Sequence, residues 1–181
     1  MESRPLRVRA GTRRRRHLSR VAVISDTHLP RGNRALPDAC AKLLRGAELI
    51  LHAGDFVSVA FLEELEGLGP PVEAVHGNMD EPALKASLPR EQVVEAGSVR
   101  IGMVHDAGPP VRREARLAAR FPDCEAVVYG HSHVPQVERF QHLWVLNPGL
   151  PYGQAPAAGA DHARPADPRP PHHAGARESL I

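Results

Sequence analysis

Carboxylate, amide and imidazole side chains recur in this sequence where short apolar runs come to an end. Three such runs finish in the segments 25–28 (Ser-Asp-Thr-His), 52–55 (His-Ala-Gly-Asp) and 76–80 (His-Gly-Asn-Met-Asp). Two later runs end in His105 and in the segment 130–133 (Gly-His-Ser-His). Because ligand sites of open α/β sheets lie beyond the carboxyl ends of the strands, we expect these five segments to meet at one edge.

The residue types in these segments favour metal chemistry. An aspartate such as Asp26 or Asp55, taken alone, is better explained as a helix cap or a turn residue than as a metal ligand. That explanation gives no reason for several histidines beside carboxylates at strand ends. Hard oxygens with imidazoles suit divalent first-row metals, and the absence of cysteine argues against a closed structural zinc site. The candidate metal ligands are Asp26, His28, Asp55, Asn78, His105, His131 and His133.

This number of donors exceeds what one ion can bind. Two ions about 3.5–4 Å apart, sharing one carboxylate and one solvent molecule, would use all of the donors. Glycine stands directly before Asp55, Asn78 and His131, which fits close backbone packing at a crowded metal centre. His52 and His76 are expected to lie inside strands and to be structural.

Apolar periodicity predicts the elements that position these residues. Strands are expected at 21–25, 48–52 and 72–76, separated by helices at about 36–46 and 57–67. This β-α-β-α-β order predicts parallel strands with right-handed crossovers. Beyond residue 80 the expected elements are a hairpin of 92–95 and 98–105, a helix at 111–121, a strand at 125–129, and an antiparallel pair at 134–140 and 143–146.

Composition predicts one folded domain, at residues 20–149. The 181 residues are 42% hydrophobic and 24% charged, which is typical of a globular chain with a single core. Residues 1–19 are expected to form a disordered basic extension, since they are polar and rich in arginine. Residues 150–181 are expected to form a disordered Ala/Pro-rich tail, and their composition also fits a frameshifted end of a GC-rich coding sequence.

Cysteine usage and hydropathy indicate the compartment. Cys40 and Cys124 lack the spacing of a disulfide framework or a CxxC pair, which favours a reducing compartment. The apolar stretch 21–24 after the arginine run is too short for the core of an export signal, and no window approaches a membrane span. We therefore expect a cytoplasmic protein with no membrane partner. A nucleic-acid contact of the N-terminal arginines is the less favoured alternative.

The order of the motifs resembles that of calcineurin-like metallophosphoesterases. Asp-x-His, Gly-Asp, Gly-Asn-x-Asp, a lone histidine after a strand and Gly-His-Ser-His follow one another over about residues 20–149. The run Gly-His-Ser-His-Val-Pro and the closing Asn-Pro-Gly are similar to the small YfcE-type phosphodiesterase branch. The resemblance implies an α/β fold in which a two-sheet β-sandwich is flanked by helices in four αββα layers. It also implies a metal-dependent phosphoesterase acting on phosphodiesters.

The same resemblance implies a role for each candidate residue. The metal ligands would be Asp26, His28 and His133 for one ion, Asn78, His105 and His131 for the other, and Asp55 as the bridge. The catalytic set would include His105 and also Asp80, which would orient a ligand or the substrate from outside the metal shell. A hydroxide bridging the two ions would attack phosphorus in line.

The implied cofactors are two divalent ions, with Mn²⁺ first and Ni²⁺, Fe²⁺, Co²⁺ or Zn²⁺ as alternatives. The implied partner is a small phosphate ester, nucleotide-derived esters included.

Two positions depart from the family pattern. Met79 stands where several branches carry a histidine that protonates the leaving group, and the segment 105–107 (His-Asp-Ala) lacks the second histidine of His-Gly-His. A methionine cannot transfer a proton, so we expect a preference for acidic leaving groups.

The alternative function is a protein-binding scaffold similar to the retromer subunit of the same fold, in which the metal site is degraded. Because all seven ligand positions are filled here, catalysis is favoured.

Overall fold

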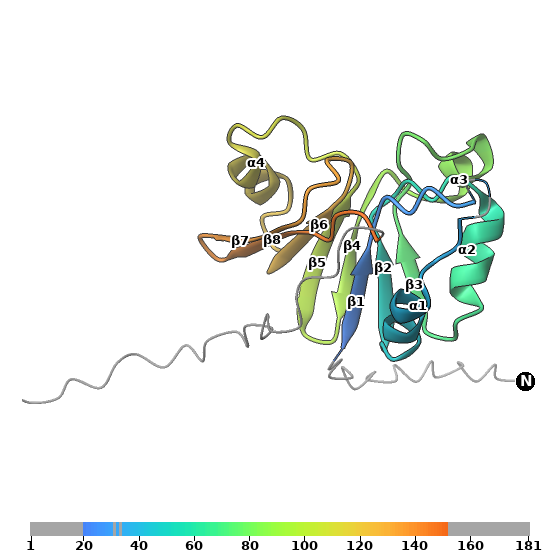
Figure 1. The fold of residues 1–181 in the computed structure, drawn as a ribbon. Helices are drawn as coiled ribbons and strands as arrows, with labels where there is room; N and C mark the ends of the chain where they lie inside the picture. Colours follow the sequence, from blue (N-terminus) through green and yellow to red (C-terminus); the bar gives the residue numbers. More distant parts are fainter. Residues whose placement is uncertain (1–19, 31, 33, 152–181) are drawn as a thin grey trace, which may run out of the picture.

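The computed structural model of the chain describes residues 20–30, 32 and 34–151 (Figure 1). The predicted extension at 1–19 and residues 152–181 of the predicted tail at 150–181 lie outside this part of the chain. The strands are β1 (Val21–Ile24), β2 (Leu49–His52), β3 (Val72–Ala74), β4 (Glu91–Ala96), β5 (Val99–Val104), β6 (Ala126–Tyr129), β7 (Gln136–Phe140) and β8 (Leu143–Asn147). The helices are α1 (Asp38–Arg45), α2 (Val59–Glu66), α3 (Pro82–Ser87) and α4 (Arg113–Arg120).

The first half of the chain forms a parallel sheet of three strands in the order β1-β2-β3. Ile24 pairs with His52 and His52 pairs with Ala74, so the strands end side by side. The predicted β-α-β-α-β unit is thereby confirmed. This register is what brings the loops after the three strands to one edge of the sheet.

The second half forms a five-stranded mixed sheet in the order β4-β5-β6-β8-β7. The predicted hairpin is confirmed: β4 and β5 are antiparallel, and Gly97 turns the chain between them with a φ of 67°. Strands β5, β6 and β8 run parallel, so His105 and the segment 130–133 follow neighbouring strand ends. The predicted antiparallel pair of β7 and β8 is also present.

Alternating side chains build three apolar clusters and so set the layers. In β2, Ile50 faces the cluster under α1, α2 and α3, whereas Leu49 and Leu51 face the cluster between the two sheets. In β6, Val128 joins the cluster between the sheets, and Val127 packs with α4 on the outer face of the second sheet. The layers are therefore helices, three-stranded sheet, five-stranded sheet and helix (Figure 1), which confirms the predicted αββα fold.

Several predicted boundaries differ from the structure. The first helix begins at Asp38 rather than residue 36, since Pro37 holds an extended backbone with a ψ of 138°. Strand β3 ends at Ala74, because the His76 N–H leaves the sheet and bonds the Pro89 carbonyl, 3.0 Å away. The prediction that His76 lies inside a strand is therefore wrong.

Helix α3 is an element that the sequence did not predict. It is six residues long, begins with proline at its first turn and buries Leu84. A helix of fewer than two turns shows too little periodicity to be recognised from apolar spacing. In the part of the chain that the structure describes, no helix has the length and apolar character needed to cross a membrane.

Candidate metal centre

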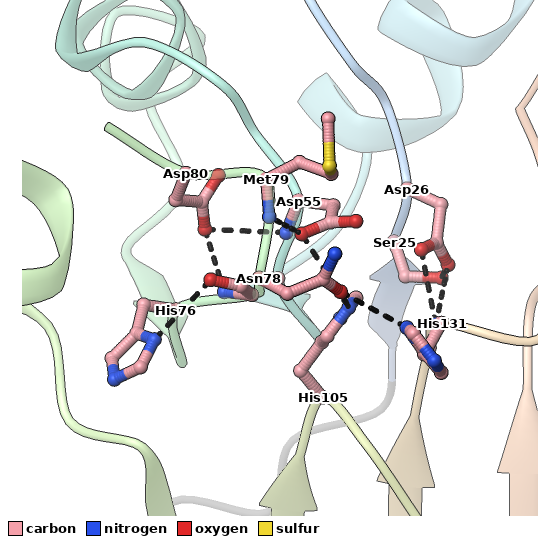
Figure 2. Close-up of polar contacts among 12 residues, drawn as sticks. Ser25, Asp26, Asp55, His76, Asn78, Met79, Asp80, His105 and His131 are labelled. Carbon is pink, nitrogen blue, oxygen red and sulfur yellow. Dashed lines mark hydrogen bonds and ion pairs between the residues drawn. The ribbon is translucent and has the colours of Figure 1, made fainter. Parts of the chain in front are cut away.

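Five of the predicted ligands meet where the carboxyl ends of the strands of the two sheets lie next to each other (Figure 2). Asp26 follows β1, Asp55 follows β2 and Asn78 follows β3. His105 and His131 follow β5 and β6 of the second sheet. The fold thus assembles the site from loops as far apart in sequence as those of Asp26 and His131, which are separated by 105 residues.

A first ligand group consists of Asp26, His28, Asp55 and His133. One ligand atom from each of these residues lies within 4.8 Å of all the others. The Nε2 atom of His133 is 3.4 Å from Asp26 Oδ1 and 3.3 Å from His28 Nε2, and His28 Nε2 is 3.9 Å from Asp55 Oδ2. Asp26 is fully buried and Asp55 almost so, and a nearby cation would offset the cost of burying their charges.

A second ligand group consists of Asp55, Asn78, His105 and His131. The Asn78 Oδ1 atom is 3.0 Å from His105 Nε2 and 3.0 Å from His131 Nδ1, as Figure 2 shows. His105 Nε2 is also 3.4 Å from Asp55 Oδ1. The two oxygens of Asp55 therefore face different ligand groups, and all seven predicted ligands lie together.

Hydrogen bonding orients the imidazole of His105 toward the second ligand group. Its Nδ1 atom is 2.8 Å from the Ala53 carbonyl, which can only accept, so Nδ1 carries a proton. The Nε2 atom is thereby turned toward Asn78 and Asp55. Metal-binding histidines are commonly held in this way by a backbone carbonyl.

The electrostatics of the site favour positive charge beside Asp55. Burial on its own would lower the pKa of His105, but the hydrogen bond and the charge of Asp55 outweigh burial and raise that pKa. Burial would likewise raise the pKa of Asp55, but the hydrogen bonds from His105 and from the Met79 N–H outweigh it and lower that pKa. Both pKa shifts mean that the site favours an ionised Asp55 with a positive charge beside it. A bound cation would occupy the same kind of environment.

Backbone strain is concentrated at the same residues. Five of the eight non-glycine residues with positive φ in the described part of the chain belong to the two ligand groups. They are Asp26, His28, Asp55, His131 and His133, with φ between 48° and 65°. A left-handed conformation costs about 1–3 kcal/mol for such a residue, so the surrounding contacts must hold each one in place.

The glycines next to the ligands are required by space, which confirms the expectation from the sequence. A Cβ atom on Gly77 would lie 2.0 Å from Asp55 Oδ1, and one on Gly54 would lie 2.7 Å from His105 Nδ1. A Cβ atom on Gly130 would lie 2.8 Å from Asp26 Oδ2. The ligand side chains therefore pack directly against glycine backbone.

Asp80 holds the backbone of two ligand loops. Its buried carboxylate accepts hydrogen bonds from three backbone N–H groups: Gly77 at 2.6 Å, Val57 at 2.7 Å and Asp55 at 3.2 Å. Figure 2 shows the carboxylate between the loops that carry Asp55 and Asn78. These three bonds connect the two ligand loops, and the predicted role of Asp80 in orienting a ligand or the substrate stays a prediction.

We expect Asp80→Asn to lower both stability and metal affinity. An amide has a single acceptor oxygen, so its NH₂ group would face at least one of the three backbone N–H groups. That N–H would lose its hydrogen bond, which costs about 1–3 kcal/mol of stability. Metal affinity should fall about 10–100-fold, as for other residues that support ligands. Urea unfolding and Mn²⁺ titration would measure the two effects. Asp106→Asn is the matched control, since Asp106 accepts one N–H, from Gly108, in an exposed turn. Equal behaviour of the two variants would refute the role of Asp80.

His52 and Thr27 connect the loops after β1 and β2. The Gly54 N–H donates to His52 Nδ1, so His52 Nε2 carries the proton and donates to Thr27 Oγ1 at 3.1 Å. Thr27 Oγ1 in turn donates to the Asp55 carbonyl. Burial lowers the pKa of His52 well below its usual value, which keeps the ring neutral. The structural role expected for His52 agrees with these contacts, whereas Thr27 was not singled out from the sequence.

The remaining residues of interest lie outside the two ligand groups. His76 points away from them in Figure 2, and its Nδ1 atom is 3.4 Å from the Gly77 carbonyl. Ala107, at the position of the family's second histidine, is buried in the cluster under α4. Cys40 packs against the core cluster of the helices.

Comparisons with known proteins find related sequences and structures. Residues 20–163 match the family model described as the calcineurin-like phosphoesterase superfamily domain. A probable metallophosphoesterase of Methanothermobacter thermautotrophicus is 38% identical over 133 residues, which are 72% of this chain and 76% of that protein. A phosphodiesterase of Methanocaldococcus jannaschii is 27% identical over 143 residues, 72% of this chain and 82% of that protein. The crystal structure of Vps29 from Chaetomium thermophilum has a TM-score of 0.64 at 27% identity and covers 74% of this chain and 69% of its own.

Proposed function

The chain belongs to the calcineurin-like phosphoesterase superfamily, and from this membership and its two ligand groups we propose that it is a phosphodiesterase with two divalent cations. As a family member it is a metallophosphoesterase, a hydrolase acting on phosphoric ester bonds. The observation that carries the two-metal proposal is the orientation of Asp55. Its Oδ2 faces the first ligand group and its Oδ1 faces the second, so this one carboxylate lies within reach of both proposed ions.

The proposed ligands divide between the two ions. They are Asp26, His28 and His133 with Asp55 Oδ2 for the first ion, and Asn78, His105 and His131 with Asp55 Oδ1 for the second. Cations held there would supply Lewis acidity to the phosphate oxygens and activate a shared hydroxide for in-line attack on phosphorus. The donors are oxygens and imidazoles, which accept several divalent metals, and we propose Mn²⁺ first among them.

The chain itself contributes preorganisation. Ala53 turns His105 Nε2 toward the second ligand group, Asp80 holds the loops of Asp55 and Asn78, and Asp26 accepts the His131 N–H at 3.0 Å. Each of these contacts fixes a ligand before substrate arrives. Charge that develops in the transition state then meets groups that need not move.

Hydrolysis of a phosphodiester by a metallophosphoesterase of this kind is tested most simply with a chromogenic substrate. Purified protein with added Mn²⁺ is expected to release nitrophenolate from bis(p-nitrophenyl) phosphate. Chelator should stop the release, and renewed Mn²⁺ should restore it. If no metal-dependent hydrolysis appears at any divalent metal tested, the proposed function is wrong.

Met79 lies beside the proposed bridge, at a position from which a side chain with an ionisable proton could protonate the leaving group. Its backbone N–H donates to Asp55 Oδ1 at 2.8 Å, so the residue lies directly beside the proposed bridge. Its side chain is 58% exposed and carries no ionisable proton. We propose that water protonates the leaving group, which favours diesters with acidic leaving groups.

We expect Met79→His to raise turnover on alkyl diesters much more than turnover on nitrophenyl diesters. A general acid contributes about 10²–10⁴-fold where the leaving group needs a proton, and little where it does not. The ratio of kcat values on matched alkyl and nitrophenyl esters measures the effect, and Met79→Leu is the control for shape. Equal rates of the unchanged protein on both esters would contradict this explanation.

A protein-binding scaffold is the second candidate function, and the similarity to Vps29 is the observation in its favour. A scaffold without catalysis has no need of seven converging ligands or of strained backbone at five of them. Both features are present here, so we favour the enzyme. Metal-dependent turnover on the chromogenic diester separates the two candidates, since a scaffold would show none.

A further inference from the structure

The Asn147-Pro148-Gly149 turn packs against the loop that carries His131 and His133. Asn147 ends β8 and is 2% exposed. Its Nδ2 atom donates to the Gly130 carbonyl at 2.9 Å and to Ser132 Oγ at 3.0 Å, while its Oδ1 atom accepts from the Gly149 N–H at 2.8 Å. Both amide protons and the amide oxygen are therefore used.

Gly149 holds the same loop at its other end. It has a φ of 70°, which favours glycine, and a Cβ atom there would lie 2.6 Å from Pro135 Cγ. Pro135 directly follows the segment 130–134. The turn therefore contacts the loop both before and after its two histidines.

The loop needs such an anchor because its backbone is strained. His131 and His133 both have positive φ, with Ser132 between them donating its N–H to the Gly130 carbonyl at 2.7 Å. Asp26 also anchors the loop by accepting the His131 N–H, and the His105 carbonyl does so by accepting the Gly130 N–H at 3.0 Å. Asp26 is itself a proposed ligand, whereas Asn147 lies in neither ligand group.

We propose that Asn147 is a positioning residue that sets the two histidines for both metal positions at once. The inference rests on the proposed function, because it takes His133 as a ligand of the first ion and His131 as a ligand of the second. Loss of a residue that supports a single ligand would weaken the binding of one ion. Asn147 fixes the segment between two ligands of different ions, so its loss should weaken both.

Asn147→Asp is the variant that tests this. The carboxylate keeps the shape and can still accept the Gly149 N–H, but it places an acceptor against the Gly130 carbonyl, and the loop loses its donor. We expect Mn²⁺ affinity to fall about 10–100-fold at both positions, with kcat falling in parallel. Calorimetric titration would give the two affinities, and electron paramagnetic resonance would show loss of the coupled Mn²⁺ pair at concentrations where the unchanged protein retains it.

Gln92→Glu is the matched control. The Gln92 amide also donates to a backbone carbonyl, that of Ala74 at 3.1 Å, and to Glu73 Oε2 at 3.4 Å, and both acceptors lie in strand β3 rather than in a ligand loop. We expect this variant to lose stability and to keep the Mn²⁺ affinity of the unchanged protein. If Asn147→Asp does not fold, Ser132→Ala takes its place, since it removes one of the two acceptors of the Asn147 amide and should weaken both ions by a smaller factor.

The outcomes separate this inference from the proposed function. Binding of fewer than two Mn²⁺ ions by the unchanged protein would refute the two-metal proposal. The role of Asn147 would be overturned if the unchanged protein binds two ions and the Asn147→Asp variant binds them with the same affinities. Where that variant does not fold, the same comparison is made with Ser132→Ala. A fall at one position alone would also overturn that role, because the inference requires both ions to weaken.

Discussion

Replacing Asp55 by alanine is expected to abolish hydrolysis and to release both cations. Asp55 Oδ2 faces the first ligand group and Oδ1 faces the second, so one substitution removes a ligand from each. The change also leaves His105 without the carboxylate that raises its pKa. The loss of activity should exceed the roughly 10–100-fold that substitutions of supporting residues cost.

A carboxylate outside the site provides the control for Asp55→Ala. Asp123 pairs with Arg100 at 3.5 Å, and its side chain is 76% exposed. Asp123→Ala should therefore change stability by no more than about 0.5 kcal/mol and leave activity intact. Steady-state kinetics with the chromogenic diester and metal analysis of both variants make the comparison. Near-normal turnover of Asp55→Ala would show that Asp55 is not the bridge.

Gly77→Ala is expected to have an effect close to that of Asp55→Ala although it changes no ligand. The added methyl group would lie 2.0 Å from Asp55 Oδ1 and 2.4 Å from the Asp55 backbone nitrogen. Real side chains do not approach so closely, so the Asp55 carboxylate must move away from one or both ligand groups. Both metals and most of the activity should be lost, together with about 1–3 kcal/mol of stability from overpacking.

Gly67→Ala separates this steric effect from a general cost of replacing glycine. Gly67 caps α2 with a φ of −64°, and a Cβ atom there would meet its nearest neighbour, the Glu64 carbonyl oxygen, at 3.3 Å. We expect that variant to bind two metals and to retain activity. Metal content and kcat are measured for both variants side by side. Retention of two ions by Gly77→Ala would show that the ligand loops are looser than their packing indicates.

Much of the fold and of the ligand arrangement follows from local sequence. Short apolar runs such as 49–52 and 126–129 can satisfy their burial only inside a sheet, and the helices between the early strands dictate parallel pairing. Once the strands are parallel, Asp26, Asp55 and Asn78 must reach a common edge. The glycines beside them were also predictable, because a crowded polar edge leaves no room for a Cβ atom.

The residues that hold the ligands were less accessible to sequence reasoning. Asp80 accepts the N–H groups of Val57 and Asp55, which are 23 and 25 residues away in sequence, as well as that of nearby Gly77. No rule of spacing reveals which backbone donors a carboxylate will reach. Thr27 lies between two ligands, yet its contact with His52 depends on how β1 and β2 pair. Asn147 was visible as part of a closing motif, but its contacts with Gly130 and Ser132 depend on the packing of β8 against β6. Such tertiary hydrogen bonds appear only when the sheets have been assembled.

The metal content of the active protein tests the central proposal most directly. Protein reconstituted with Mn²⁺, freed of excess metal and confirmed as active on the chromogenic diester would be analysed for metal per chain by elemental analysis. Two ligand groups that share Asp55 predict two Mn²⁺ ions per chain, both lost in Asp55→Ala. A fully active preparation that contains one ion or none per chain would contradict the two-metal centre.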